Sequence, residues 1–168
     1  NTQLALVQVK DQPLFLNQLG DGKAFDILYT NMNALKLSGE LNYTFQEKFS
    51  LLASASYSNF SKLDAVTDAF GLIPLEATAG LIWKPIGDLQ VKADLFYRSG
   101  SLYRDSFSLT SRRLSSAVDM NFGVEFGLMP KLNLWLQMNN LFNNTYQRWN
   151  QYPVFGFNVM GGVVYSFQ

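Results

Sequence analysis

Apolar and polar residues alternate along most of this chain, and the alternation restricts the possible folds more than any other feature. From Leu35 to Phe45, every odd position is apolar or glycine, and every even position is polar. A period of two over nine or more residues predicts a β-strand with two different faces. A first strand, over residues 4–10, alternates less regularly. Seven further strands are predicted over residues 35–45, 49–57, 75–83, 89–97, 118–126, 132–138 and 157–167.

The connections between the eight predicted strands fall into two length classes. The short ones are residues 46–48, 84–88 and 129–131, and the long ones are residues 17–26, 59–74, 99–113 and 140–155. Long and short connections alternate without exception, so the tight turns lie at one end of the sheet and the long loops at the other. An antiparallel up-and-down sheet of this kind is typical of outer-membrane β-barrels.

Alternation alone also fits a soluble barrel whose apolar face points inward. Three features favour a barrel whose apolar face points outward into lipid. Charged residues make up only 15% of the chain, against roughly 25% in soluble domains. The polar faces use small uncharged residues where a wet surface would use Lys and Glu: Ser54, Ser56, Ser58, Thr78, Gly80, Asn121, Gly123 and Asn133. Aromatic residues also stand at strand ends, where interfacial girdles lie: Phe45, Phe49, Tyr57, Trp83, Tyr97 and Tyr165.

The C-terminus resembles the terminal signature of outer-membrane barrels, which the barrel-assembly machinery recognises. Every second position back from Phe167 is aromatic, apolar or glycine, beginning with Tyr165 and Val163. Gln168 follows the terminal aromatic residue and departs from the signature.

From residue 132 onward the chain resembles the end of a TonB-dependent receptor. The residues that carry the resemblance are Asn140, Leu141, Phe142, Tyr146, Tyr152, Pro153, Gly156, Tyr165 and Phe167. Phe157 stands where many members have an Arg. The spacing of Trp149 and Tyr152 is similar to that of receptors from the Bacteroidetes.

The resemblance implies a larger barrel of 22 strands that surrounds a plug domain. We therefore expect residues 1–168 to be a single barrel segment without plug, located in the bacterial outer membrane. It would be part of a receptor that imports a scarce nutrient of the siderophore, vitamin, glycan or peptide class. The implied partners are outer-membrane lipid, the barrel-assembly machinery, and the TonB system through an N-terminal part outside this sequence. The alternative is a complete eight-stranded barrel with a structural or adhesive role, whose small lumenal residues would fill a narrow barrel.

The composition argues against enzymatic chemistry. The chain has no His and no Cys, so neither a Ser-His-Asp triad nor a thiolate metal site can form. We expect no enzyme activity, cofactor or metal, and the balance of 13 basic and 13 acidic residues predicts no nucleic-acid partner.

Several acidic or glycine-rich positions have weak alternative interpretations. Asp94 and Asp119 could form a carboxylate pair, but Lys92, Arg98, Glu40 and Glu125 share their face, which favours a lumenal charge network. Asp64 and Asp68 are weak calcium candidates. Residues 20–23 lack the spacing of a phosphate loop and are better explained as a hairpin tip.

Aromatic and polar residues also gather in the last two long loops. In a receptor, such loops capture the ligand at the outer mouth, whereas in any barrel they can pack on one another. The candidate ligand-contacting residues are Tyr103, Phe107, Tyr146, Arg148, Trp149 and Tyr152.

Overall fold

The computed structural model describes residues 1–167, apart from the side chains of Gly22 and Lys23. Its elements are all strands, and eight of them form one antiparallel sheet in the order β1-β2-β3-β4-β5-β8-β9-β12. Their bounds are β1 Thr2–Gln18, β2 Asp21–Phe45, β3 Phe49–Ser61, β4 Leu75–Ile86, β5 Leu89–Arg98, β8 Ala117–Met129, β9 Leu132–Asn139 and β12 Asn158–Tyr165. All eight predicted strands are present. No helix among the described residues is long and apolar enough to span a membrane.

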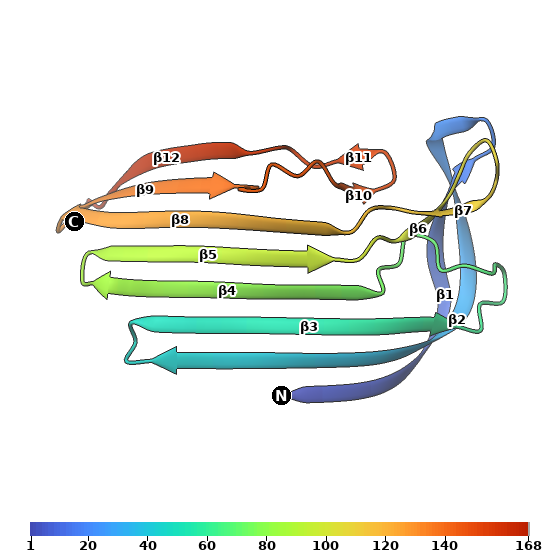
Figure 1. Cartoon of the computed structure of the whole chain (residues 1–168), viewed down its shortest axis with the longest axis horizontal. Coiled ribbons are helices and arrows are strands. Elements are labelled where there is room, and N and C mark those ends of the chain that lie inside the picture. The colour runs from blue at the N-terminus through green and yellow to red at the C-terminus, as the bar shows by residue number, and fades with distance from the viewer. Residues whose placement is uncertain (168) are drawn as a thin grey trace.

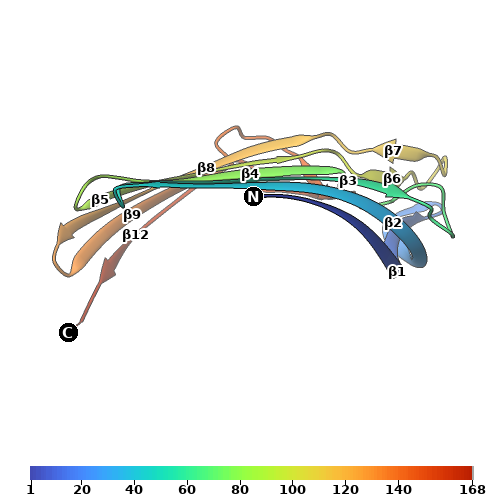
Figure 2. The same ribbon diagram turned by 90° about the horizontal axis from the view of Figure 1, so that it is seen from below.

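The sheet is a single curved layer with open edges (Figures 1 and 2). β1 pairs only with β2, and β12 pairs only with β9. The described residues therefore do not form the closed eight-stranded barrel of the alternative interpretation. Each outer strand leaves a row of backbone N–H and C=O groups that would need a further strand inside hydrocarbon.

The apolar face of the sheet is not covered by any second layer (Figure 2). Leu41 and Tyr43 of β2, for example, remain 57% and 51% exposed. The register aligns Phe45, Phe49 and Trp83 across three strands at the tight-turn end. Tyr57 lies eight residues from Phe49, which is roughly 27 Å along a strand and, at barrel tilt, roughly 20 Å of membrane thickness. An apolar band of this height with aromatic borders suits the lipid side of a barrel wall.

The first hairpin differs from the sequence-based prediction. Residues 17–26 are not a long loop: β1 and β2 continue to a two-residue turn at Leu19 and Gly20, where Gly20 has φ +74°. The expected hairpin tip is present, but it lies at Leu19 and Gly20 and not over residues 20–23, because Asp21 already belongs to β2. The strands reach 17 and 25 residues, more than the 9–11 that cross a bilayer, so the hairpin projects well beyond the membrane band.

A β-bulge bends this projecting hairpin. The register skips from Val9 to Gln12, so that Lys10 and Asp11 lie opposite Asn31. Asp11 adopts φ +52°, and its N–H donates to the Asn31 side-chain oxygen over 3.1 Å. Bulges bend the strand that carries them and increase its twist. Beyond this point the hairpin turns across the loop ends of the other strands (Figure 1).

The long connections carry short ladders and the only tightly packed core among the described residues. β6 (Leu102–Arg104) pairs with β7 (Ser111–Arg113), and β10 (Gln147–Trp149) pairs with β11 (Tyr152–Pro153). One face of the projecting hairpin packs on the β3–β4 connection and on β6. This core contains Leu14, Leu16 and Phe70, with Leu28, Leu63, Val66, Leu72 and Leu102 against it.

Candidate ligand-binding site

A mainly apolar pocket of about 430 Å³ opens at the loop end of the sheet. Its walls come from the projecting β1–β2 hairpin, the β3–β4 connection, the segment around β6, and the β10–β11 hairpin. No charged side chain belongs to its lining, which consists of Phe15, Asn17, Phe25, Ile27, Gly71, Ser101, Leu102, Tyr103, Trp149, Asn150 and Tyr152.

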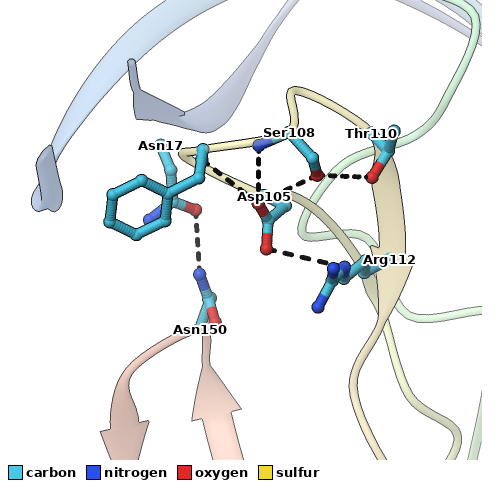
Figure 3. Close-up of polar contacts among 7 residues, drawn as sticks. Asn17, Asp105, Ser108, Thr110, Arg112 and Asn150 are labelled. Carbon is cyan, nitrogen blue, oxygen red and sulfur yellow. Dashed lines mark hydrogen bonds and ion pairs between the residues drawn. The ribbon is translucent and has the colours of Figure 1, made fainter. Parts of the chain in front are cut away.

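Polar contacts hold the projecting hairpin against the later loops. The Arg104 guanidinium donates to the Asn17 carbonyl over 2.7 and 3.1 Å, and it pairs with Asp26 at 3.7 Å. The Asn150 amide donates to the Asn17 side-chain oxygen over 2.9 Å (Figure 3). Nearer the tip, the Gly20 N–H donates to the Ser106 carbonyl over 2.9 Å. These bonds fix one wall of the pocket relative to the other.

Five of the eleven residues that line the pocket are aromatic. The rings of Phe25 and Tyr152 face each other across the pocket rim with centroids 6.3 Å apart. Trp149 remains 51% exposed, and its ring lies 3.6 Å from the place that a Cβ on Gly71 would take. Gly71 also has φ +75°, so glycine is favoured there for conformation as well as for space. Half-exposed rings with a few amide groups suit a ligand with a flat or apolar surface.

The candidate ligand-contacting residues do not all meet at this pocket. Tyr103, Trp149 and Tyr152 line it, whereas Arg148 is exposed outside the lining. Phe107 lies apart at the tip of the β6–β7 hairpin and is 80% exposed. Tyr146 is buried and takes a structural position described below. Contact of any of them with a ligand stays a prediction.

The tip that carries Phe107 is rigidly built around Asp105. The Asp105 carboxylate accepts from the N–H groups of Phe107 and Ser108 and from the Ser108 hydroxyl, over 2.9 to 3.1 Å. Arg112 approaches it to 3.5 Å, and Ser108 bonds Thr110 (Figure 3). The hydrogen bonds from Ser108, ahead of the other contacts, lower the pKa of Asp105.

Tyr146 links the last long loop to the sheet. Its hydroxyl donates to Asp119 Oδ2 over 2.9 Å. Burial, and then this carboxylate, raises the pKa of Tyr146. Asp119 lies opposite Phe96, and Asp94 lies opposite Asn121, so the two acids are displaced by two residues along the paired strands and are not register partners. Asp119 is thus used to anchor Tyr146, and the sequence alone could not show this contact.

The receptor-like motif near the C-terminus builds the turn into the last strand. Asn140 is buried, has φ +50°, and donates to the carbonyls of Asn144 and Phe155 over 2.9 Å. Its side-chain oxygen accepts the Asn144 N–H over 3.0 Å. Leu141 N–H bonds the Met120 carbonyl, which holds the turn to β8.

Other motif residues have equally local roles. A Cβ on Gly156 would lie 2.6 Å from Asn143 Oδ1, so a larger residue there would displace the Asn143 side chain, which accepts the Phe157 N–H. Pro153 pairs with Gln147 in the small β10–β11 ladder, while Phe142 stays half exposed. The rings of Tyr165 and Phe167 meet edge to face with centroids 4.8 Å apart.

Among the described residues, no group of three or more acidic side chains could hold a metal ion. Asp64 accepts a hydrogen bond from Asn31, and Asp68 accepts from Ser111 and Thr67. Both calcium candidates are thus engaged in loop contacts.

The sequence pattern did not indicate that residues of the projecting β1–β2 hairpin line the pocket. Phe15, Asn17, Phe25 and Ile27 fell inside or beside the segment predicted as a long loop. The consecutive apolar residues Leu14, Phe15 and Leu16 just before Asn17 are the signal that could have revealed a strand covered on two faces.

No protein-family model and no curated protein sequence matches the chain. Solved structures do match over nearly its whole length. The siderophore receptor PiuA from Acinetobacter baumannii has 16% identity and a TM-score of 0.68 over 98% of this chain and 26% of its own. The ferripyoverdine receptor of the Pseudomonas aeruginosa outer membrane has 11% identity and a TM-score of 0.76 over 99% and 24%. The iron transporter FrpB from Neisseria meningitidis has 18% identity and a TM-score of 0.64 over 96% and 28%.

The chain therefore spans about a quarter of the length of these proteins. They are TonB-dependent outer-membrane receptors. At such low identity the likeness concerns the fold, and it agrees with the open antiparallel sheet. The described sheet has the fold of a barrel-wall segment of TonB-dependent outer-membrane receptors.

Proposed function

We propose that this chain forms barrel wall and extracellular mouth in a TonB-dependent receptor of the bacterial outer membrane, which imports a scarce nutrient. The nutrient belongs to the siderophore, vitamin, glycan or peptide class. The protein acts as a transporter and not as an enzyme.

The observation that carries the proposal is the open eight-stranded sheet with a preformed aromatic pocket at its loop end. An apolar, uncovered sheet face requires lipid, and its two open edges require further strands. Side chains from residues as far apart as Asn17 and Asn150 are already bonded together at the mouth. A purely structural barrel has no need of such a pocket.

The implied partners follow from this role. Outer-membrane lipid covers the apolar face, the barrel-assembly machinery engages the C-terminal strand, and TonB acts through a plug domain outside this sequence. One solved neighbour is a complex with pyocin S2; for this chain, the exposed mouth loops are the surface that such a large extracellular ligand would meet.

The test is nutrient uptake by cells that carry the full-length gene as their only copy. We compare the wild-type protein with a Trp149→Ala, Tyr152→Ala variant and a matched Trp83→Ala control on the lipid-facing rim. Growth on the limiting nutrient and uptake of labelled nutrient should fall in the pocket variant and persist in the control. Equal uptake by a TonB-deficient strain would contradict the proposal, and would favour a structural or adhesive barrel.

A further inference from the structure

Ser101 presents a buried hydroxyl to the aromatic pocket. The residue is only 4% exposed and belongs to the pocket lining. Within residues 1–167, its hydroxyl makes no hydrogen bond. In the same part of the chain, the one enclosed side-chain polar atom without a partner is Asp119 Oδ1. The Ser101 hydroxyl is therefore not enclosed, and its small exposed surface lies in the pocket. A buried hydroxyl without a partner is unfavourable, and a polar group of a ligand would satisfy it.

Other polar groups of the pocket are also unused, and all of them are uncharged. The Asn150 amide donates to Asn17, while the Asn150 side-chain oxygen has no partner among the described residues. The hydroxyls of Tyr103 and Tyr152 and the indole N–H of Trp149 likewise make no hydrogen bond there. A hydroxyl can donate and accept, an amide oxygen accepts, and an indole N–H donates. The pocket thus offers both kinds of hydrogen-bonding group to a ligand.

Two charged side chains at the hairpin wall are bonded to each other and to the hairpin itself. Arg104 pairs with Asp26 at 3.7 Å and donates to the Asn17 carbonyl. The other Asp26 oxygen accepts a hydrogen bond from the Gln18 amide over 2.8 Å. None of the described lining residues is charged. A ligand that brought a charge into this pocket would lose hydration without meeting an opposite charge, so the pocket favours a neutral ligand.

A sugar ring combines the properties that this lining requires. Its C–H face is apolar and can cover a half-exposed ring such as that of Trp149, and its rim carries neutral hydroxyls that donate and accept hydrogen bonds. A flat heteroaromatic ligand would also cover the ring, but it would leave most of the polar groups of the pocket unpaired. The volume of about 430 Å³ lies within the range of roughly 300–1,000 Å³ that is usual for small-molecule sites.

We propose that the pocket binds a sugar ring of a neutral saccharide, which covers the Trp149 indole and bonds the Ser101 hydroxyl through one of its own hydroxyls. Among the nutrient classes of the proposed function, this is the glycan class without acidic sugar units. Saccharides with carboxylate or sulfate groups would meet no compensating charge in the lining. The inference rests on the proposed function for the import that follows binding.

The test uses the full-length receptor, purified in a detergent without a sugar headgroup and applied to an array of neutral and acidic saccharides. We expect binding to neutral saccharides and much weaker binding to acidic ones. Calorimetric titration of the best-bound neutral saccharide then compares variants. Trp149→Ala should weaken binding about tenfold or more, as for a central aromatic contact. Ser101→Ala should weaken it about two- to tenfold, through the loss of one neutral hydrogen bond. The control Trp83→Ala, on the lipid-facing rim, should leave affinity within about twofold.

No binding to any saccharide on the array would overturn the inference, and so would a preference for acidic saccharides or an unchanged affinity of both pocket variants. Heat-modifiable gel mobility shows that each compared variant is folded. Failure of the proposed function is distinguishable. TonB-dependent uptake of the nutrient without any saccharide binding would contradict only this inference, whereas Trp149-dependent saccharide binding without such uptake would contradict only the proposed function.

Discussion

The indole of Trp135 lies directly over Gly162 on the neighbouring strand. A Cβ at Gly162 would come within 2.8 to 2.9 Å of three ring atoms, and the two residues are register partners. The alternation places Trp135 on the otherwise small, polar face. The absence of a side chain at Gly162 thus leaves space for the indole of Trp135. This packing holds β12 against β9.

Gly162→Ala should therefore destabilise the barrel by about 1–3 kcal/mol, since Trp135 must leave its position. Gly123→Ala is the matched control, because its added Cβ would meet only ordinary contacts at 3.8 and 3.9 Å. Urea unfolding of the full-length protein in bilayers measures both. In a Trp135→Leu background the cost at Gly162 should shrink; an unchanged cost there would contradict the stacking explanation.

Leu41 and Asn42 test which face meets lipid. Leu41 lies midway along the apolar band and is 57% exposed, and Asn42 is its neighbour on the polar face. Leu41→Lys should cost about 2–4 kcal/mol if the residue lies near the bilayer midplane. Asn42→Lys should cost much less, as measured by the same unfolding assay. The reverse order would mean that the polar face points to lipid.

Phe107 and Gly87 test the orientation in the membrane. Phe107 is 80% exposed at a long-loop tip, and Gly87 lies at a tight turn with open space around it. On intact cells, an impermeant thiol reagent should label Phe107→Cys and spare Gly87→Cys. Both should react after cell lysis, which is the control for accessibility. Labelling of Gly87→Cys alone in intact cells would invert the topology.

Asn140 tests the structural role of the receptor-like motif. Asn140→Ala removes two donated bonds and one accepted bond from a buried turn, and should cost roughly 2–4 kcal/mol. Amide hydrogen exchange should rise through residues 140–157. Asn139→Ala is the control, because that side chain is bonded only to Gln137 and Asn158 in an exposed setting. Equal effects of the two substitutions would remove the special role of Asn140.

The raised pKa of Tyr146 predicts that the stability of the folded protein depends on pH in the alkaline range. Its pKa is raised in the folded protein, so its contribution is complete below the unfolded value of about 10 and is lost as pH rises through the folded value. Wild type should lose stability above pH 10 more steeply than Tyr146→Phe. The difference in tyrosinate absorbance between the two proteins gives the pKa directly. A Tyr146 that ionises at or below its ordinary value would contradict the buried bond to Asp119.

Alternation predicted the strands of the membrane band because each has one apolar and one polar surrounding. Alternation did not predict the strands of the projecting hairpin, because apolar side chains are covered on both of its faces. Leu14 and Leu16 pack on one side against the core, while Phe15 faces the pocket on the other, so the sequence there has no period of two. The bulge at Lys10 and Asp11 further shifts which positions face inward.

The candidate site was only partly predictable. Tyr103, Trp149 and Tyr152 were found from the abundance of aromatic residues in loops, without knowledge of their geometry. Asn17 could not be connected with Asn150, because a contact across 133 residues leaves no local pattern.

The pocket can be complete only after the whole segment has folded. Its walls come from the first hairpin and from the last loop, which meet through Asn17 and Asn150. A chain whose strands are still pairing therefore lacks one wall of the pocket. Contacts of this sequence separation form late, after the loop-closure entropy has been overcome. If the proposed ligand binds in this pocket, a labelled ligand would report only barrels whose assembly is complete.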